Sequence, residues 1–114
     1  MRLRGVARFS ACAAGLLFEE RGTVARGTYR GDAARRYVFR LAGVGVADVC
    51  FEDGTPFHRL CLESGVAQVQ HDCAPDRYEG RYRVLDPDRW MLGWQVTGPR
   101  KRQLITSRFV RRLA

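Results

Sequence analysis

The sequence predicts an all-β fold, an antiparallel up-and-down barrel of about 8–10 strands formed by residues 1–114 as a single domain. Three observations lead to it. A chain of 114 residues has the length of one domain. Apolar and polar residues alternate along most segments with the period of two that marks half-buried strands. Turn residues recur at short intervals between these segments, and the helical period is almost absent.

The alternation is clearest in 77–85, where Tyr78, Tyr82 and Val84 share one face and charged residues occupy the other. We expect strands over residues 2–10, 15–24, 27–32, 34–41, 46–53, 57–63, 66–72, 77–85, 89–97 and 102–111. The third and fourth of these are one long strand if the chain only bends near Gly31.

Two turns near the middle of the chain predict a face lined by histidines, because loop length fixes which residues face each other. A four-residue turn at 53–56 would place Phe51 opposite His58. A two-residue hairpin turn at 64–65 would place His58 opposite His71. Both imidazoles would then lie on the inner face as cross-strand neighbours.

The later turns continue the meander. The loop after His71 brings that residue opposite Tyr78, and the turn at 86–88 places Gly80 opposite Trp94. A glycine facing a tryptophan leaves room for the indole. Every inferred pairing keeps the apolar residues on one face, and this agreement supports the meander.

Alternate loops of a meander lie at one end, so the segments 53–56, 72–77 and 97–102 should come together. That end holds most of the unusual residues, whereas the opposite end has plain turns. We therefore predict a pocket for a small ligand there, with candidate binding residues His58, His71, Tyr78, Trp94, Asp53, Arg35, Cys73 and Lys101.

Each candidate also has an ordinary structural role. A single inward histidine is more often a hydrogen-bonded core residue than a ligand-binding one, and two that face each other make the alternatives about even. Asp53 precedes a glycine and is typical of a turn. An arginine ordinarily points outward, but Arg35 is two residues from Tyr37 and would lie on the same face of the strand. An inward arginine could bind an anionic group.

The sequence does not decide which cofactor, if any, the pocket holds. Haem or a metal at His58 and His71 is conceivable, with Cys73 as a third ligand, but no metal-binding motif is present and no metal site is predicted. The four cysteines show no C-x-x-C spacing, which favours free thiols: Cys12, Cys50, Cys61 and Cys73.

The formal net charge of +8 raises nucleic acid as a partner. Lys101 is the only lysine, however, and the arginines are spread along the chain, which favours a solvated outer surface. No apolar run is long enough to span a bilayer, and the first residues do not read as a signal peptide. A cytoplasmic protein without a membrane partner is expected.

Three functions are compatible with these residues. The first is a small-molecule binding protein with an unknown ligand. The alternative is an enzyme on the same scaffold, more doubtful than binding, with a buried histidine as general acid or base and Tyr78 or Asp53 assisting. The third is a basic surface that binds nucleic acid or an acidic partner.

Four segments together resemble a known bacterial family, the domain of unknown function 6314. They are FEDGTPFH (51–58), HDCAPDRY (71–78), WQVTGPRK (94–101) and RRYVF (35–39). The resemblance covers essentially the whole chain and implies a lipocalin-like (calycin-type) barrel, with no established activity to transfer. Thr55 stands where the family often has arginine, and Phe39 where it commonly has tryptophan.

The resemblance also implies an aromatic-rich first strand upstream of residues 4–9, which correspond to the family's second strand. Without that strand the barrel would be incompletely closed between 2–10 and 102–111. Unpaired strand edges attract other chains, so self-association through an exposed edge strand is expected.

Overall fold

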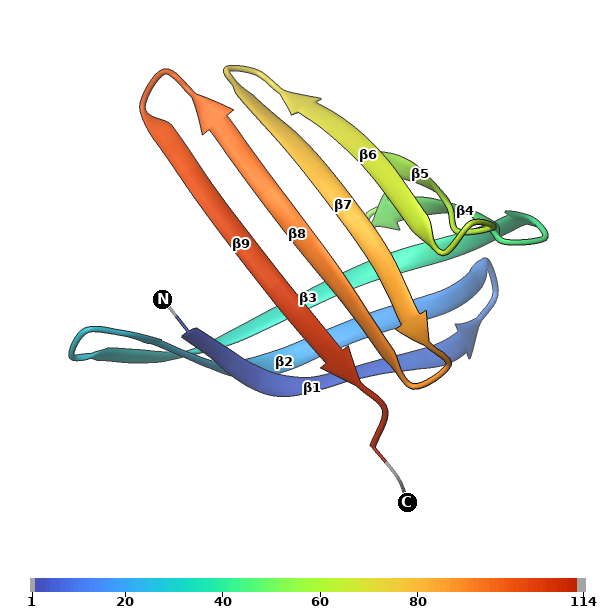
Figure 1. The fold of residues 1–114 in the computed structure, drawn as a ribbon, viewed down its shortest axis with the longest axis horizontal. Helices are drawn as coiled ribbons and strands as arrows, with labels where there is room; N and C mark the ends of the chain where they lie inside the picture. The colour runs from blue at the N-terminus through green and yellow to red at the C-terminus, as the bar shows by residue number, and fades with distance from the viewer. Residues whose placement is uncertain (1, 113–114) are drawn as a thin grey trace.

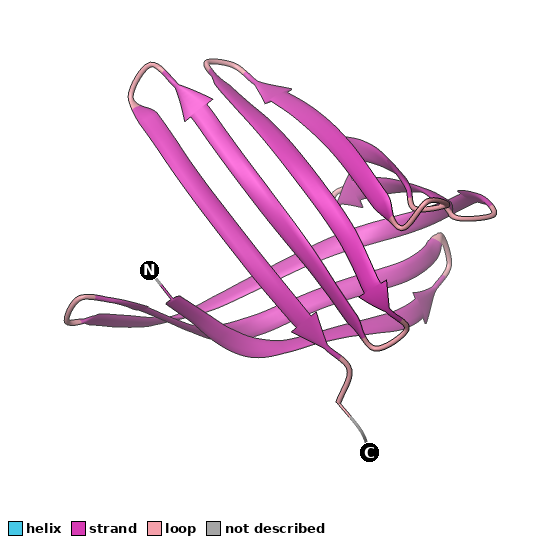
Figure 2. Ribbon diagram, viewed as in Figure 1, coloured by secondary structure: helices cyan, strands magenta, loops and turns pink. Residues whose placement is uncertain are grey.

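The computed structural model describes residues 2–112 as two antiparallel sheets whose strands cross one another (Figure 1). Short turns join the strands (Figure 2). The first sheet has the order β1 (Arg2–Cys12), β2 (Gly15–Arg26), β3 (Tyr29–Gly43), β4 (Val46–Phe51) and β5 (Pro56–Cys61). The second has the order β6 (Val66–Cys73), β7 (Asp76–Asp86), β8 (Arg89–Gly98) and β9 (Lys101–Val110).

The all-β antiparallel meander is confirmed, but the sheets do not close into a barrel. Within residues 2–112, β1 forms no ladder with β9, and β5 forms none with β6. The hairpin predicted at 64–65 is therefore wrong. The Gly65 N–H donates to the Leu62 carbonyl, and the Gly65 carbonyl accepts from the Val84 N–H on β7. These bonds turn the chain from one sheet into the other.

The strands predicted at 27–32 and 34–41 are one strand, β3. Its first half continues the ladder with β2 without interruption, and Gly31 pairs with Val24 there. The register shifts only near the end of β3, between Leu41 and Gly43. Gly31 thus lies inside one continuous strand, and no new strand starts there.

The predicted pairing of Phe51 with His58 is wrong by two residues, because His58 pairs with Val49. The turn is tighter than predicted: the Phe51 N–H donates to the Thr55 carbonyl at 2.9 Å. A register shift between Val49 and Cys50 then absorbs the difference. The residues still share one face, because a slip of two preserves the alternation.

The predicted registers of the second sheet are confirmed. His71 pairs with Tyr78, and Gly80 pairs with Trp94. A Cβ atom at Gly80 would lie 2.6 Å from Cζ3 of the Trp94 ring, so the indole occupies the space that a side chain would need.

The core lies between the sheets and is formed by Val49, Leu60, Ala67, Val69, Tyr82 and Trp94. Aromatic contacts join the sheets, including Phe57 with Trp94 at a centroid distance of 5.3 Å and Phe18 with Trp90 at 6.4 Å. Side-chain packing therefore holds the two sheets together where no ladder does. Nothing in the described chain forms a helix with the length and apolarity to cross a membrane.

Candidate functional site

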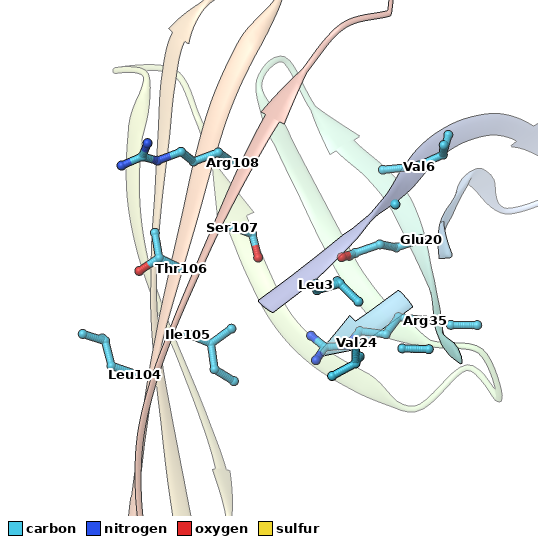
Figure 3. A pocket seen from close by; sticks show the side chains of 14 residues that line it. Leu3, Val6, Glu20, Val24, Arg35, Leu104, Ile105, Thr106, Ser107 and Arg108 are labelled. Carbon is cyan, nitrogen blue, oxygen red and sulfur yellow. The ribbon is translucent and has the colours of Figure 1, made fainter. Parts of the chain in front are cut away.

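Two pockets border Arg35 between the sheets in the described part of the chain. The sheet-edge pocket, of about 610 Å³, lies between β9 and strands β1, β2 and β3 of the first sheet (Figure 3). Its lining includes Leu3, Glu20, Val24, Arg35, Ile105 and Ser107. The aromatic pocket, of about 360 Å³, is lined by Tyr37, Phe51, Phe57, Tyr78 and Trp94 together with Arg35, His71, Cys73, Val96, Gln103 and Ile105. Arg35 and Ile105 belong to both, so we call the two together the cleft.

Strand alternation explains why these side chains face the cleft. Glu20 and Arg35 are paired across β2 and β3 and therefore lie on the same face of the first sheet. Both point into the space between the sheets, and Ile105 and Ser107 point toward them from β9 (Figure 3). Their neighbour Thr106 points to the other side of β9, as alternation requires.

Arg35 is the cation of the cleft. The side chain is exposed even though it faces inward, because the sheets do not close over it. No carboxylate among residues 2–112 lies within 4.0 Å of its guanidinium as an ion-pair partner. Burial raises the pKa of the Glu20 carboxyl, and the nearby Arg35 opposes this only in part. The cleft thus presents a positive charge that has no ion-pair partner among the described residues, beside a carboxyl group whose pKa is raised.

His71 lines the aromatic pocket and is held there by a hydrogen bond. Its Nδ1 lies 3.0 Å from the carbonyl oxygen of Phe57. A carbonyl can only accept, so Nδ1 carries the proton, and the neutral tautomer that this contact selects has its lone pair on Nε2. Among the described residues, no hydrogen bond occupies Nε2.

His58 does not line the cleft. The side chain is 9% exposed, and its Nε2 lies 3.1 Å from the hydroxyl oxygen of Tyr82. Burial lowers the pKa of His58 to about 4, so the ring is neutral near pH 7. Nδ1 is buried without a hydrogen-bond partner in the described chain. The predicted cross-strand pair of His58 and His71 is wrong, because the chain changes sheets between them.

Two other candidates lie outside the cleft lining. Asp53 shapes its own turn, where its Oδ1 accepts from the Thr55 N–H at 3.0 Å and from the Thr55 hydroxyl at 2.7 Å. Lys101 forms an ion pair with Asp76 at 3.7 Å. That pair joins two of the three segments expected at one end, 72–77 and 97–102. The structure thus gathers Arg35, His71, Cys73, Tyr78 and Trp94, and it assigns His58, Asp53 and Lys101 to other contacts.

Glu20, Gln103 and Ser107 are cleft residues that the sequence reasoning missed. A signal existed for Glu20, which shares parity with the buried Phe18 on β2. A charged residue on an apolar face is a candidate for a binding site. Ser107 carried no such signal, because only the approach of β9 to the first sheet gives it a role.

A metal or haem shared by the two histidines does not fit this geometry. The Phe57 ring contacts both imidazoles, with centroid distances of 4.7 Å to His58 and 5.0 Å to His71. One nitrogen of each ring is engaged, by Tyr82 and by the Phe57 carbonyl. Within residues 2–112, no three histidine, cysteine or acidic side chains are grouped as metal ligands.

Comparison with protein families gives a match over nearly the whole chain. Residues 1–111 match the model of a family described as a family of unknown function, DUF6314. Neither the curated proteins nor the solved structures contain a match to the chain. Because the matched segment covers almost the whole sequence, the protein is a member of the DUF6314 family of unknown function.

Proposed function

We propose that the protein binds a small molecule in the cleft between its two sheets. The observation that carries this proposal is Arg35, an inward-facing cation at the junction of the two pockets that has no ion-pair partner among residues 2–112. Pocket volumes of about 610 and 360 Å³ suit small ligands, whose sites span roughly 300–1,000 Å³. Binding inside the β-structure would be lipocalin-like, with the open sandwich replacing a closed barrel.

The enzyme alternative has weaker support. His58, the buried histidine, is held by Tyr82 inside the core and does not reach the cleft lining. His71 does reach it, but in the described chain no carboxylate or hydroxyl is hydrogen-bonded to its ring. A general base is usually oriented by such a group. The cleft therefore favours binding over catalysis.

A nucleic-acid-binding surface also has weaker support. Arginines lie on the outer faces of both sheets, and several form ion pairs with nearby acids: Arg36 with Glu19 and Glu52, Arg59 with Asp48, Arg77 with Asp72, and Arg89 with Asp86. These pairs reduce the net positive potential of each face.

Binding in the cleft can be tested with the neutral fluorescent probe N-phenyl-1-naphthylamine. We expect saturable binding with increased probe fluorescence. Cys73→Trp should weaken it by about fivefold or more, because the indole would fill part of the aromatic pocket. Cys61→Trp is the matched control, since Cys61 is also an exposed free cysteine but does not line the cleft. Absence of saturable binding, or equal weakening by both variants, would contradict the proposal.

The exposed edge of β1 is expected to mediate self-association with a second copy. β1 pairs only with β2 in the described chain, and Val6 and Phe9 on it are 46% and 45% exposed. Val6→Lys should weaken association by about tenfold, because pairing would bury the new charge. Val44→Lys, in a turn where Val44 is 89% exposed, is the control.

Sedimentation velocity measures this association. Arg4 and Arg8 also lie on β1, so two such edges repel each other, and added salt should strengthen the dimer. A monomer at all salt concentrations, or a dimer indifferent to Val6→Lys, would remove the edge as an interface.

A further inference from the structure

The aromatic pocket has a wall of roughly parallel rings. Phe57 stacks on Tyr37 with a centroid distance of 5.5 Å and an interplanar angle of 25°. On Trp94 it stacks at 5.3 Å and 17°. Tyr78 meets Trp94 nearly edge-on, at 6.4 Å and 76°. Rings stacked on one another in this way offer their edges and outer faces to the pocket, and a planar aromatic molecule can pack against these.

The charge beside this wall favours an anion. Arg35 borders the aromatic pocket, and its guanidinium can bind a carboxylate through two parallel hydrogen bonds. Glu20, which faces the cleft from the neighbouring strand, forms no ion pair with Arg35 within 4.0 Å, so its carboxylate does not contact the guanidinium directly. The net charge of +8 adds a long-range attraction for anions.

His71 adds a third property that a ligand would need, which is a group that donates a hydrogen bond. The Phe57 carbonyl fixes the proton on Nδ1, so Nε2 can accept a hydrogen bond from a ligand. A ligand that meets it with an N–H or O–H group satisfies this acceptor, whereas a purely hydrocarbon ring would leave it unpaired.

From this arrangement we infer that the ligand is an aromatic carboxylate whose ring system carries an N–H or O–H donor. The ring system lies against Tyr37, Phe57 and Trp94. The carboxylate pairs with Arg35, and the donor bonds to Nε2 of His71. This ligand class rests on the proposed binding function, because it names what the cleft holds.

A series of matched compounds tests the class by isothermal titration calorimetry. Indole-3-acetate carries the ring, the donor and the acid, and it should bind most tightly. Indole-3-acetamide lacks the charge and should bind about tenfold more weakly. 1-Naphthaleneacetate lacks the N–H and should bind about three- to fivefold more weakly. Decanoate has the acid without a ring and should also bind more weakly than indole-3-acetate.

Variants assign each preference to a residue. Arg35→Gln should abolish the preference for the acid over the amide, because the carboxylate loses the cation that pairs with it. Arg40→Gln is the control on the same strand, because Arg40 is exposed and lines neither pocket. His71→Phe keeps a ring of similar shape and should abolish the preference for indole over naphthalene.

The outcomes separate this inference from the proposed function. Saturable binding of the neutral probe, with equal affinity for acid and amide or with decanoate bound best, would overturn the aromatic carboxylate alone. If neither the probe nor any compound of the series binds, both proposals fail. An acid preference that survives Arg35→Gln would overturn the assignment to Arg35.

Discussion

Gly80→Val is expected to lower the free energy of unfolding by about 3 kcal/mol, the upper end for overpacking a core. A Cβ atom at Gly80 would lie 2.6 Å from Cζ3 of Trp94 and 2.8 Å from Cγ2 of Val69. Both neighbours are core residues, exposed by only 7% and 8%, and have little room to move away. Valine adds two further methyl groups, so the indole must leave its position or the two strands must shift.

Gly93→Val is the matched control for this substitution. Gly93 lies on β8, next to the strand that carries Gly80, but no atom lies within 4 Å of a Cβ built there. Its free energy of unfolding should change by no more than about 0.5 kcal/mol. Urea unfolding followed by tryptophan fluorescence compares the two variants. Equal midpoints would show that the indole does not occupy the space over Gly80.

Mild acid is expected to destabilise the protein through His58. Burial lowers the pKa of His58 to about 4 in the folded state, whereas the unfolded chain has the ordinary value near 6.5. As the pH falls, the unfolded state therefore binds the proton first. The stabilisation is fully present above pH 6.5 and is lost between pH 6.5 and 4. This amounts to about 2–3 kcal/mol of the free energy of unfolding.

The double variant His58→Leu/Tyr82→Phe isolates this effect. It removes the imidazole and leaves no unpaired Tyr82 hydroxyl behind. Its free energy of unfolding should fall less between pH 7 and 4, by the amount that His58 contributes in the wild type. Tyr82→Phe alone retains His58 and should keep the larger fall. Chemical denaturation at pH 7, 5.5 and 4 measures all three, and identical pH profiles would exclude His58 as the cause.

The second sheet was predictable because its hairpins are local. The turn at 74–75 and the one before Arg89 are short, and each is flanked by strands with unbroken alternation. Turn length and alternation together leave one register in which the apolar residues share a face. The pairing of Gly80 with Trp94 follows from that register and is found in the structure.

The change of sheet at Gly65 could not be predicted in the same way. A two-residue turn between apolar strands has the composition of a hairpin. What separates β5 from β6 is the bond from the Val84 N–H to the Gly65 carbonyl, between residues distant in the sequence. The shift between Val49 and Cys50 is likewise set by the tertiary fit of a tight turn.

The candidate site was predictable where it depends only on which side chains of a strand point to the same face. Arg35 shares parity with Tyr37, and both line the aromatic pocket. The alternation of side chains also placed His58 on the inner face. It could not tell whether an inner residue lies in the buried core, as His58 does, or lines the cleft. That distinction depends on how closely the two sheets approach each other at each point along the strands.

The absence of a ladder between β1 and β9 in the described chain has a consequence for folding kinetics. Every strand pair of both sheets joins neighbours in the sequence, so each ladder can grow from its own hairpin. A closed barrel would require the first and last strands to meet, at a large cost in loop entropy before any bond rewards it. Here the distant contacts are side-chain contacts such as Phe18 with Phe109, at a centroid distance of 6.2 Å. The two meanders can therefore form early and independently, and their docking becomes the late step of folding.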